Sequence, residues 1–161
     1  WKLKEQMTGA ARSGKQNIVE GSEGMSTSLK SAIKLTNISR ASLEELLGDL
    51  EDFVRQSGLK RWSKEDKRIR RFRKHSIKLV RYLSSLSSLQ NSVKRDKKRD
   101  RVLREIGLPK EQEKAANLLI TLCHQASYLL HRQVKALEKK HKKEGGYTEK
   151  LYRKRKEYRG Y

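Results

Sequence analysis

The chain has 161 residues, of which 34% are hydrophobic and 37% charged, and its formal net charge is +21. This length suits one ordinary domain with a charged appendage, and the short apolar runs predict neither a membrane-spanning helix nor a signal peptide. The lone Cys123 excludes an internal disulfide and fits a reducing compartment, so we expect a cytoplasmic protein. One proline among many helix-forming residues predicts an all-α fold.

The first two predicted helices form the first third of the chain. A helix over residues 2–20 has small residues on its packing face, and Gly21 is expected to end it in the left-handed conformation. Residues 26–28 offer N-caps for a much longer helix over residues 29–54, whose apolar positions recur at steps of three, four and seven. At about 1.5 Å per residue this rod is roughly 39 Å long and needs partner helices of similar length.

Two later helices supply those partners. Gly58 ends the long helix, and Ser63 is expected to cap a basic third helix over about residues 64–90. The last long helix is expected over about residues 110–143, with Pro109 in its first turn.

The remaining segments are strongly basic. Residues 91–104 are either a solvated helix extension or a mobile linker, and Gly145-Gly146 separates the last long helix from a tyrosine-rich tail. We therefore predict an all-α, up-down bundle of three or four long helices packed antiparallel in residues 1–146. A basic insertion occupies about residues 60–108 of it, and a basic tail follows in residues 147–161.

The positive charge is concentrated in the middle of the chain. Residues 1–58 have a net charge of zero, whereas residues 59–101 carry +13 and residues 147–161 carry +4. Arginine and lysine without base-reading polar neighbours favour contact with phosphates, hence RNA or DNA binding with little sequence specificity. The candidate nucleic-acid-binding residues are Arg68, Arg70, Arg71, Arg73, Lys74, Lys78, Lys94, Arg95, Lys97, Lys98, Arg99, Arg101, Arg153 and Arg155.

Other anion sites are less favoured. A membrane surface would suit the amphipathic third helix, but that helix needs its apolar stripe inside the bundle, so we expect no membrane partner. Residues 9–16 nearly match a phosphate-binding loop, yet Gln16 replaces the hydroxyl residue and no strand precedes the segment. The tyrosines of the tail either stack on bases or dock on a neighbouring subunit.

Three segments carry a family resemblance. They are GAARSGKQNIVEGS at 9–22, IKLTNISRASLEELLGDLEDF at 33–53 and KEGG at 143–146, followed by the basic tail. They resemble the bacterial four-helix-bundle protein family, which includes proteins encoded in ribosomal-RNA intervening sequences. Its relatives include the accessory variability protein of diversity-generating retroelements.

The resemblance implies an antiparallel four-helix bundle that assembles as a homo-oligomer, commonly a pentamer. It also implies a basic surface for nucleic acid, and in the retroelement relative a reverse transcriptase partner. The family's first helix would precede Trp1. Either residues upstream are missing, or the basic helix over residues 64–90 or a neighbouring subunit takes the place of that helix. Within the matched run, Arg12 and Lys15 are candidate anion or subunit-interface contacts, or simply part of a solvated face.

The sequence offers no site for an enzyme. It has no paired nucleophile and base at helical spacing, and His124 and His131 without a nearby carboxylate make a poor metal site. We expect no cofactor and no metal. The favoured function is a non-enzymatic nucleic-acid-binding bundle, and the alternative is an oligomeric scaffold that assists a reverse transcriptase or another nucleic-acid enzyme.

Overall fold

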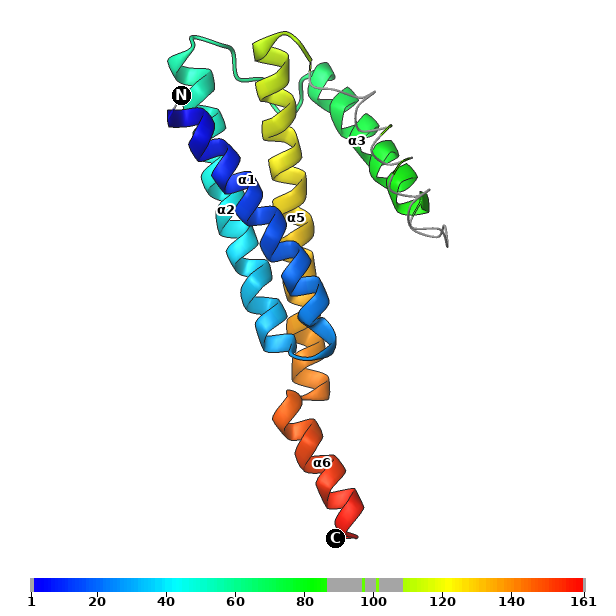
Figure 1. Cartoon of the computed structure of the whole chain (residues 1–161). Helices are drawn as coiled ribbons and strands as arrows, with labels where there is room; N and C mark the ends of the chain where they lie inside the picture. Colours follow the sequence, from blue (N-terminus) through cyan, green and yellow to red (C-terminus); the bar gives the residue numbers. More distant parts are fainter. Residues whose placement is uncertain (1, 87–96, 98–100, 102–108, 161) are drawn as a thin grey trace. The chain divides into compact units, whose positions relative to one another are not determined.

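The computed structural model describes residues 2–86, 97, 101 and 109–160 (Figure 1). Every regular element in this part of the chain is helical, and none of these helices is long and apolar enough to cross a membrane. The chain divides into two compact units, residues 1–49 with 123–161 and residues 50–122. The elements are α1 (Lys2–Glu23), the short 3₁₀ helix η1 (Gly24–Ser26), α2 (Leu29–Gln56), α3 (Lys67–Leu86), α5 (Gln112–Glu144) and α6 (Tyr147–Arg159).

In the first unit, α1 and the first part of α2 form a closely packed hairpin around η1 (Figure 1). Gly14 lies against Ser39, whose hydroxyl donates a 2.8 Å hydrogen bond to the Gly14 carbonyl oxygen. Nearer the turn, Gly21 lies against Ala32 and Leu35. Two glycines without side chains therefore let the two helix backbones approach.

Gly21 does not end α1, contrary to the sequence-based prediction. It is buried inside the helix, which continues to Glu23, and the described residues with positive φ are Gly58, Gly145 and Gly160. A helical conformation at Gly21 extends α1 by three residues beyond the predicted end and keeps Gly21 itself against α2. The close contact with Leu35, and not the turn itself, explains why glycine stands there.

The face of α2 that is most buried in this unit is partly polar. Thr36, Ser39 and Ser42 are each at most 6% exposed, whereas the apolar Ile38 is 39% exposed. Thr36 and Ser39 donate their hydroxyl hydrogens to main-chain carbonyl oxygens, so they are buried without an unpaired donor. Apolar spacing alone, which counts Ile38 and leaves out these hydroxyl residues, therefore misses part of the packing face.

The ends of α2 follow the predicted signals. The Ser28 hydroxyl accepts the Ser31 N–H at 3.2 Å and caps the first turn. At the other end Gly58 has a φ of 63°, and the N–H groups of Gly58 and Leu59 bond back to the carbonyl oxygens of Arg55 and Val54. This pattern of hydrogen bonds ends the helix and requires a residue in the left-handed conformation, which glycine adopts readily.

In the second unit, α3 begins later than predicted. The Asp66 carboxylate accepts the Arg68 N–H at 2.8 Å, which makes Asp66 the N-cap in place of Ser63. Residues 64–66 form a turn before the helix. The predicted end near residue 90, and most of the predicted extension over 91–104, lie outside the described residues.

The helix α5 starts at Gln112, after Pro109 and not with it, and it buries only some of its apolar side chains. Ile120, Leu130 and Val134 are buried, but Leu129 is 56% exposed. Gly145, with a φ of 73°, ends the helix as predicted, and Gly146 begins α6. The tail is therefore helical over Tyr147–Arg159.

Candidate nucleic-acid interface

The helix α3 separates its charges from its apolar side chains. Ile69 is buried at 3% exposure, and Phe72 is half-buried on the same side of the helix. At 3.6 residues per turn, the opposite side collects side chains that line an open surface hollow. They are Lys67, Arg70, Arg71, Lys74, His75 and Lys78.

These side chains form a continuous basic stripe, defined here as Lys67, Arg70, Arg71, Lys74 and Lys78. All five are exposed. Their steps of three, one, three and four extend the stripe over about 16 Å of helix. In the part of the chain that the structure describes, no ion pair joins any of them to a carboxylate. The stripe therefore presents five positive charges whose hydrogen-bond donors face solvent.

His75 lies within the same hollow. One of its ring nitrogens, Nδ1, is 2.9 Å from the Arg71 carbonyl oxygen, as expected if Nδ1–H donates to that oxygen. That tautomer leaves the other ring nitrogen free at the surface. In that tautomer the other ring nitrogen is a hydrogen-bond acceptor, so His75 is not counted among the cations of the stripe.

Arg68 has a different environment from the stripe. It donates to the Asp66 carboxylate from Nε at 3.1 Å and from Nη2 at 2.9 Å, and its guanidinium lies 3.4 Å above the Trp62 ring. This pair lowers the pKa of Asp66 to about 2, chiefly through the side-chain hydrogen bond from Arg68. Arg68 is thus occupied by contacts within the fold, and Arg73 is half-buried on the apolar side.

Trp62 fixes the loop that leads into α3. Its side chain is 3% exposed, its ring stacks on Phe72 with 6.0 Å between centroids, and its indole Nε1–H donates to the Glu113 carboxylate at 2.6 Å. The Trp62 main-chain N–H donates to Asn117 Oδ1 at 2.8 Å, and Asn117 Nδ2 donates to the Lys60 carbonyl oxygen at 2.9 Å. These bonds tie the loop and the start of α3 to α5.

The hydrogen bonds to Glu113 change the pKa of its carboxyl group. Its pKa is lowered, first by the hydrogen bond from the Trp62 indole and then by the N–H of Lys60. Sequence reasoning missed Glu113 and Asn117. The available signal was their spacing of four, which places two polar side chains on one face of a helix beside apolar residues.

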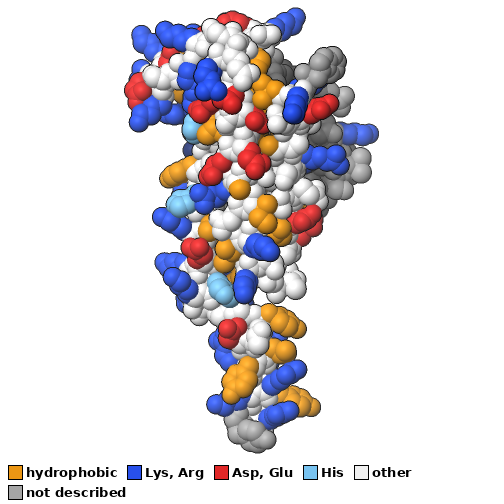
Figure 2. Space-filling view, turned by 90° about the vertical axis from the view of Figure 1, so that its left-hand side faces the viewer, with side chains coloured by type: hydrophobic (Ala, Val, Ile, Leu, Met, Phe, Trp, Pro, Cys, Tyr) orange, Lys and Arg blue, Asp and Glu red, His pale blue; other side chains and the backbone are white. Residues whose placement is uncertain are grey.

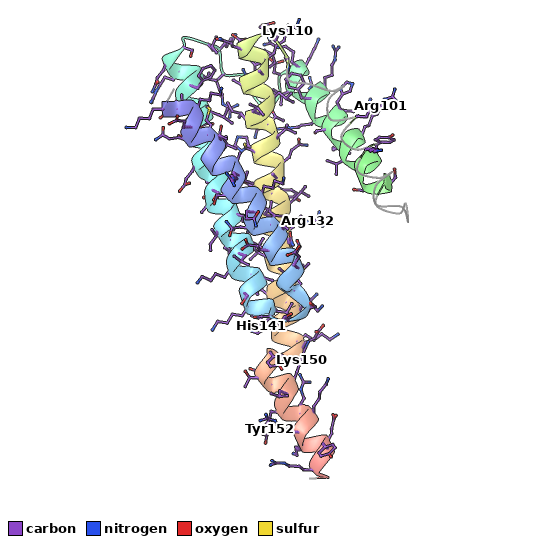
Figure 3. The ribbon with its side chains drawn as sticks, in the orientation of Figure 1. Arg101, Lys110, Arg132, His141, Lys150 and Tyr152 are labelled. Atoms are coloured by element: carbon purple, nitrogen blue, oxygen red, sulfur yellow. The ribbon has the colours of Figure 1, made fainter. Side chains whose placement is uncertain are left out.

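The other predicted contacts are scattered. Lys97 and Arg101 are exposed, whereas Lys94, Arg95, Lys98 and Arg99 lie outside the described residues. In α6, Arg153 donates to the Glu144 carbonyl oxygen at the junction with α5, and Arg155 is fully at the surface. Figure 3 shows the neighbouring Lys150 and Tyr152 projecting from this helix.

Arg12 and Lys15 are exposed on α1. Two acidic side chains of α1 and α2 already have partners, because Glu20 accepts a hydrogen bond from Gln16 and Glu44 lies 3.8 Å from Arg40. Residues 9–16 are helical throughout, so their N–H groups do not form a phosphate-binding loop.

Histidine, cysteine and carboxylate side chains do not gather into a metal-binding group of three or more anywhere in the described ranges. Cys123 is buried, and burial raises the pKa of its thiol. His124 is exposed and His131 is half-buried on α5.

Comparison of the sequence with models of protein families, with curated proteins and with solved structures gives no match.

Proposed function

We propose that this protein binds nucleic acid through the phosphate backbone, with the basic stripe of α3 as its main contact. The observation that supports this proposal is five exposed cations on one helix face with no described carboxylate paired to them. The lysines and arginines of the stripe would neutralise phosphates and so release the counterions that are condensed on the nucleic acid. The stripe contains no Asn or Gln to read base edges, so little sequence preference is expected.

The wider assembly is part of the same proposal. The helices would complete an antiparallel bundle of the four-helix type, as the family resemblance implies, and copies of it would associate into a homo-oligomer. An oligomer would repeat the stripe and so increase the avidity for a long polyanion.

A second candidate is a scaffold that assists a nucleic-acid enzyme such as a reverse transcriptase. The observation in its favour is the pair of apolar side chains exposed on α5, Tyr128 at 62% and Leu129 at 56%. Tyrosine is enriched in protein interfaces, and the exposed leucine beside it adds apolar area. Under this alternative, substituting the stripe would leave partner binding intact.

The test is a charge-neutralised variant, Arg70→Gln, Arg71→Gln, Lys74→Gln and Lys78→Gln. Its binding to labelled RNA and DNA is measured across a salt series. If four phosphate contacts are lost, the slope of log affinity against log salt becomes shallower by about 3.6 for duplex DNA, at roughly 0.9 per phosphate. The affinity at any one salt concentration also falls.

A matched control removes the same charge elsewhere. Lys2, Lys4, Lys30 and Lys34 are exposed on α1 and α2, and Lys→Gln at all four lowers the net charge equally. This variant should change only the overall electrostatic potential of the protein. The slope of log affinity against log salt should therefore stay near that of the original chain. Equal losses in the two variants would contradict a localised interface on α3.

A further inference from the structure

The helix α6 carries exposed aromatic rings among its cations. Tyr152 is 69% exposed and Tyr158 is 94% exposed. Arg155 lies three residues from each of them, so the three side chains form one slanted row on the helix surface, which we call the tyrosine ridge. Figure 2 shows blue and orange side chains interleaved at the lower end of the chain, which is α6.

The charges around the ridge have one sign. Arg159, one residue beyond Tyr158 and seven beyond Tyr152, flanks the ridge on the same side of the helix. Glu157 points to roughly the opposite side at about 100° per residue, and Glu149 is turned back to the helix start, where it accepts N–H groups including that of Gly146. Arg155 and Arg159 form no ion pair within the part of the chain described here.

We propose that the tyrosine ridge binds single-stranded nucleic acid by stacking two bases on Tyr152 and Tyr158. The order ring, guanidinium, ring along the ridge matches the order base, phosphate, base along a strand. Stacking tolerates any base because every base has a π-face. This inference rests on the proposed function, and it assigns single strands as the preferred class of nucleic acid.

Two other occupants fit the ridge less well. An interfacial membrane helix needs a broad apolar face, and the described part of α6 offers Leu151 as its only aliphatic side chain. An acidic protein surface would pair with the arginines, but its carboxylates would make no specific contact with the two exposed rings beside them. Duplex DNA hides its bases within the stack, so it can use the arginines and not the rings.

The test uses the whole chain with Tyr152→Leu and Tyr158→Leu together. Leucine is a good helix former, and it removes the aromatic ring on which a base would stack. Anisotropy is measured with three labelled probes at one salt concentration: oligothymidine, an abasic oligomer of the same length, and a duplex. We expect the variant to bind oligothymidine at least about fivefold more weakly, with both other probes changed less than about twofold.

Two controls accompany this variant. Tyr152→Phe with Tyr158→Phe keeps both rings and should bind oligothymidine like the original chain. Tyr128→Leu removes an exposed tyrosine from α5 and should have no effect. Far-UV circular dichroism of each variant checks that the helix content is unchanged.

The outcomes separate this inference from the proposed function. An unchanged affinity for oligothymidine, or an equal loss on the abasic oligomer, would overturn base stacking while backbone binding by α3 stands. Loss of binding to phosphatidylserine vesicles with no loss on oligothymidine would assign the ridge to a membrane and also overturn it. A chain that binds none of the three probes would instead remove the proposed function itself.

Discussion

Asn117 is the single residue whose loss should most weaken the loop before α3. It is fully buried at 0% exposure, accepts the Trp62 N–H and donates to the Lys60 carbonyl oxygen. Asn117→Ala would remove the partner of the buried Trp62 N–H and of the part-buried Lys60 carbonyl oxygen. We expect the free energy of unfolding to fall by about 1–3 kcal/mol, measured by urea denaturation.

The control for this prediction is Asn37→Ala on α2. Asn37 is exposed and its amide oxygen is 3.4 Å from Arg40, so its loss should change the free energy of unfolding by less than about 0.5 kcal/mol. If Asn117→Ala unfolds at the same urea concentration as this control, the loop is not held as described.

Glu113 predicts how stability depends on pH. Its pKa is lowered in the folded chain, so its contribution is fully present above its ordinary pKa of 4.5 and is lost as pH falls through the lower folded value. In Glu113→Gln this loss cannot occur. Melting temperature measured against pH should therefore fall less steeply below pH 4.5 in the variant than in the original chain.

Asp66 does not interfere with this comparison. The pKa of Asp66 is lowered from 3.8 to about 2, so the stabilisation that Asp66 contributes is lost only below pH 3.8. The Glu113→Gln variant and the original chain both contain Asp66, so this loss is the same in both. The difference between the two curves should therefore open between pH 4.5 and the folded pKa of Glu113. Parallel curves over that range would contradict the bond from Trp62 to Glu113.

Trp62 illustrates what sequence alone leaves open at this scale. An indole beside a basic helix is compatible both with stacking on a base and with burial. Which one occurs depends on a carboxylate and an amide more than fifty residues away, at Glu113 and Asn117. Helical periodicity relates residues within one helix and gives no information on such a pairing.

At the scale of single helices, the glycines of α1 differ in what surrounds them. A Cβ added at Gly9 would meet no atom within 4 Å, whereas one at Gly21 would lie 3.3 Å from the Leu35 Cβ. Gly9→Ala should therefore stabilise the chain by about 0.5–1 kcal/mol, the difference in helix propensity. Gly21→Ala should gain clearly less because Leu35 must move.

Thermal and urea unfolding of both variants measure this difference. The informative quantity is the gap between them, since both substitutions give the same gain in propensity. Equal stabilisation at the two sites would mean that α1 does not approach α2 closely at Gly21.

The helices themselves were largely predictable from the sequence. Steps of three and four identify α2 and its end at Gly58, because a helix interior obeys periodicity and a left-handed end requires glycine. The start of α3 was not, since Ser63 and Asp66 are both good caps and the anchoring of Trp62 decides between them. The buried hydroxyls of Ser39 and Ser42 were missed because periodicity counts apolar residues only.

At the scale of the whole molecule, the net charge of +21 makes the folded chain repel itself. Salt screens this repulsion, as the Debye length falls from roughly 30 Å at 0.01 M to roughly 8 Å at 0.15 M. We expect the melting temperature to rise over this range of sodium chloride while nucleic-acid affinity falls.

Scanning calorimetry measures the first effect and anisotropy the second. The melting temperature should rise and the affinity should fall as salt is added, because screening of the positive charges causes both changes. A melting temperature that falls with added salt would indicate that attractive ion pairs dominate the folded chain.

The candidate interface was predictable in part at this scale. Counting charges along the chain locates the excess between residues 59 and 101, which contains the stripe. Counting cannot separate Arg68, engaged by Asp66 and Trp62, from Arg71 only three residues later with its guanidinium in solvent. Only the structure shows that Arg68 contacts the turn before α3 and that Arg71 is exposed at the surface.

The burial of Cys123 has a practical consequence for such experiments. Thiol reagents react with the thiolate, but Cys123 is only 6% exposed and its burial raises the pKa of the thiol. A maleimide dye should therefore leave the native cysteine untouched under brief labelling. A cysteine introduced at an exposed site such as Lys4 would then carry the dye alone, with the natural thiol kept in place.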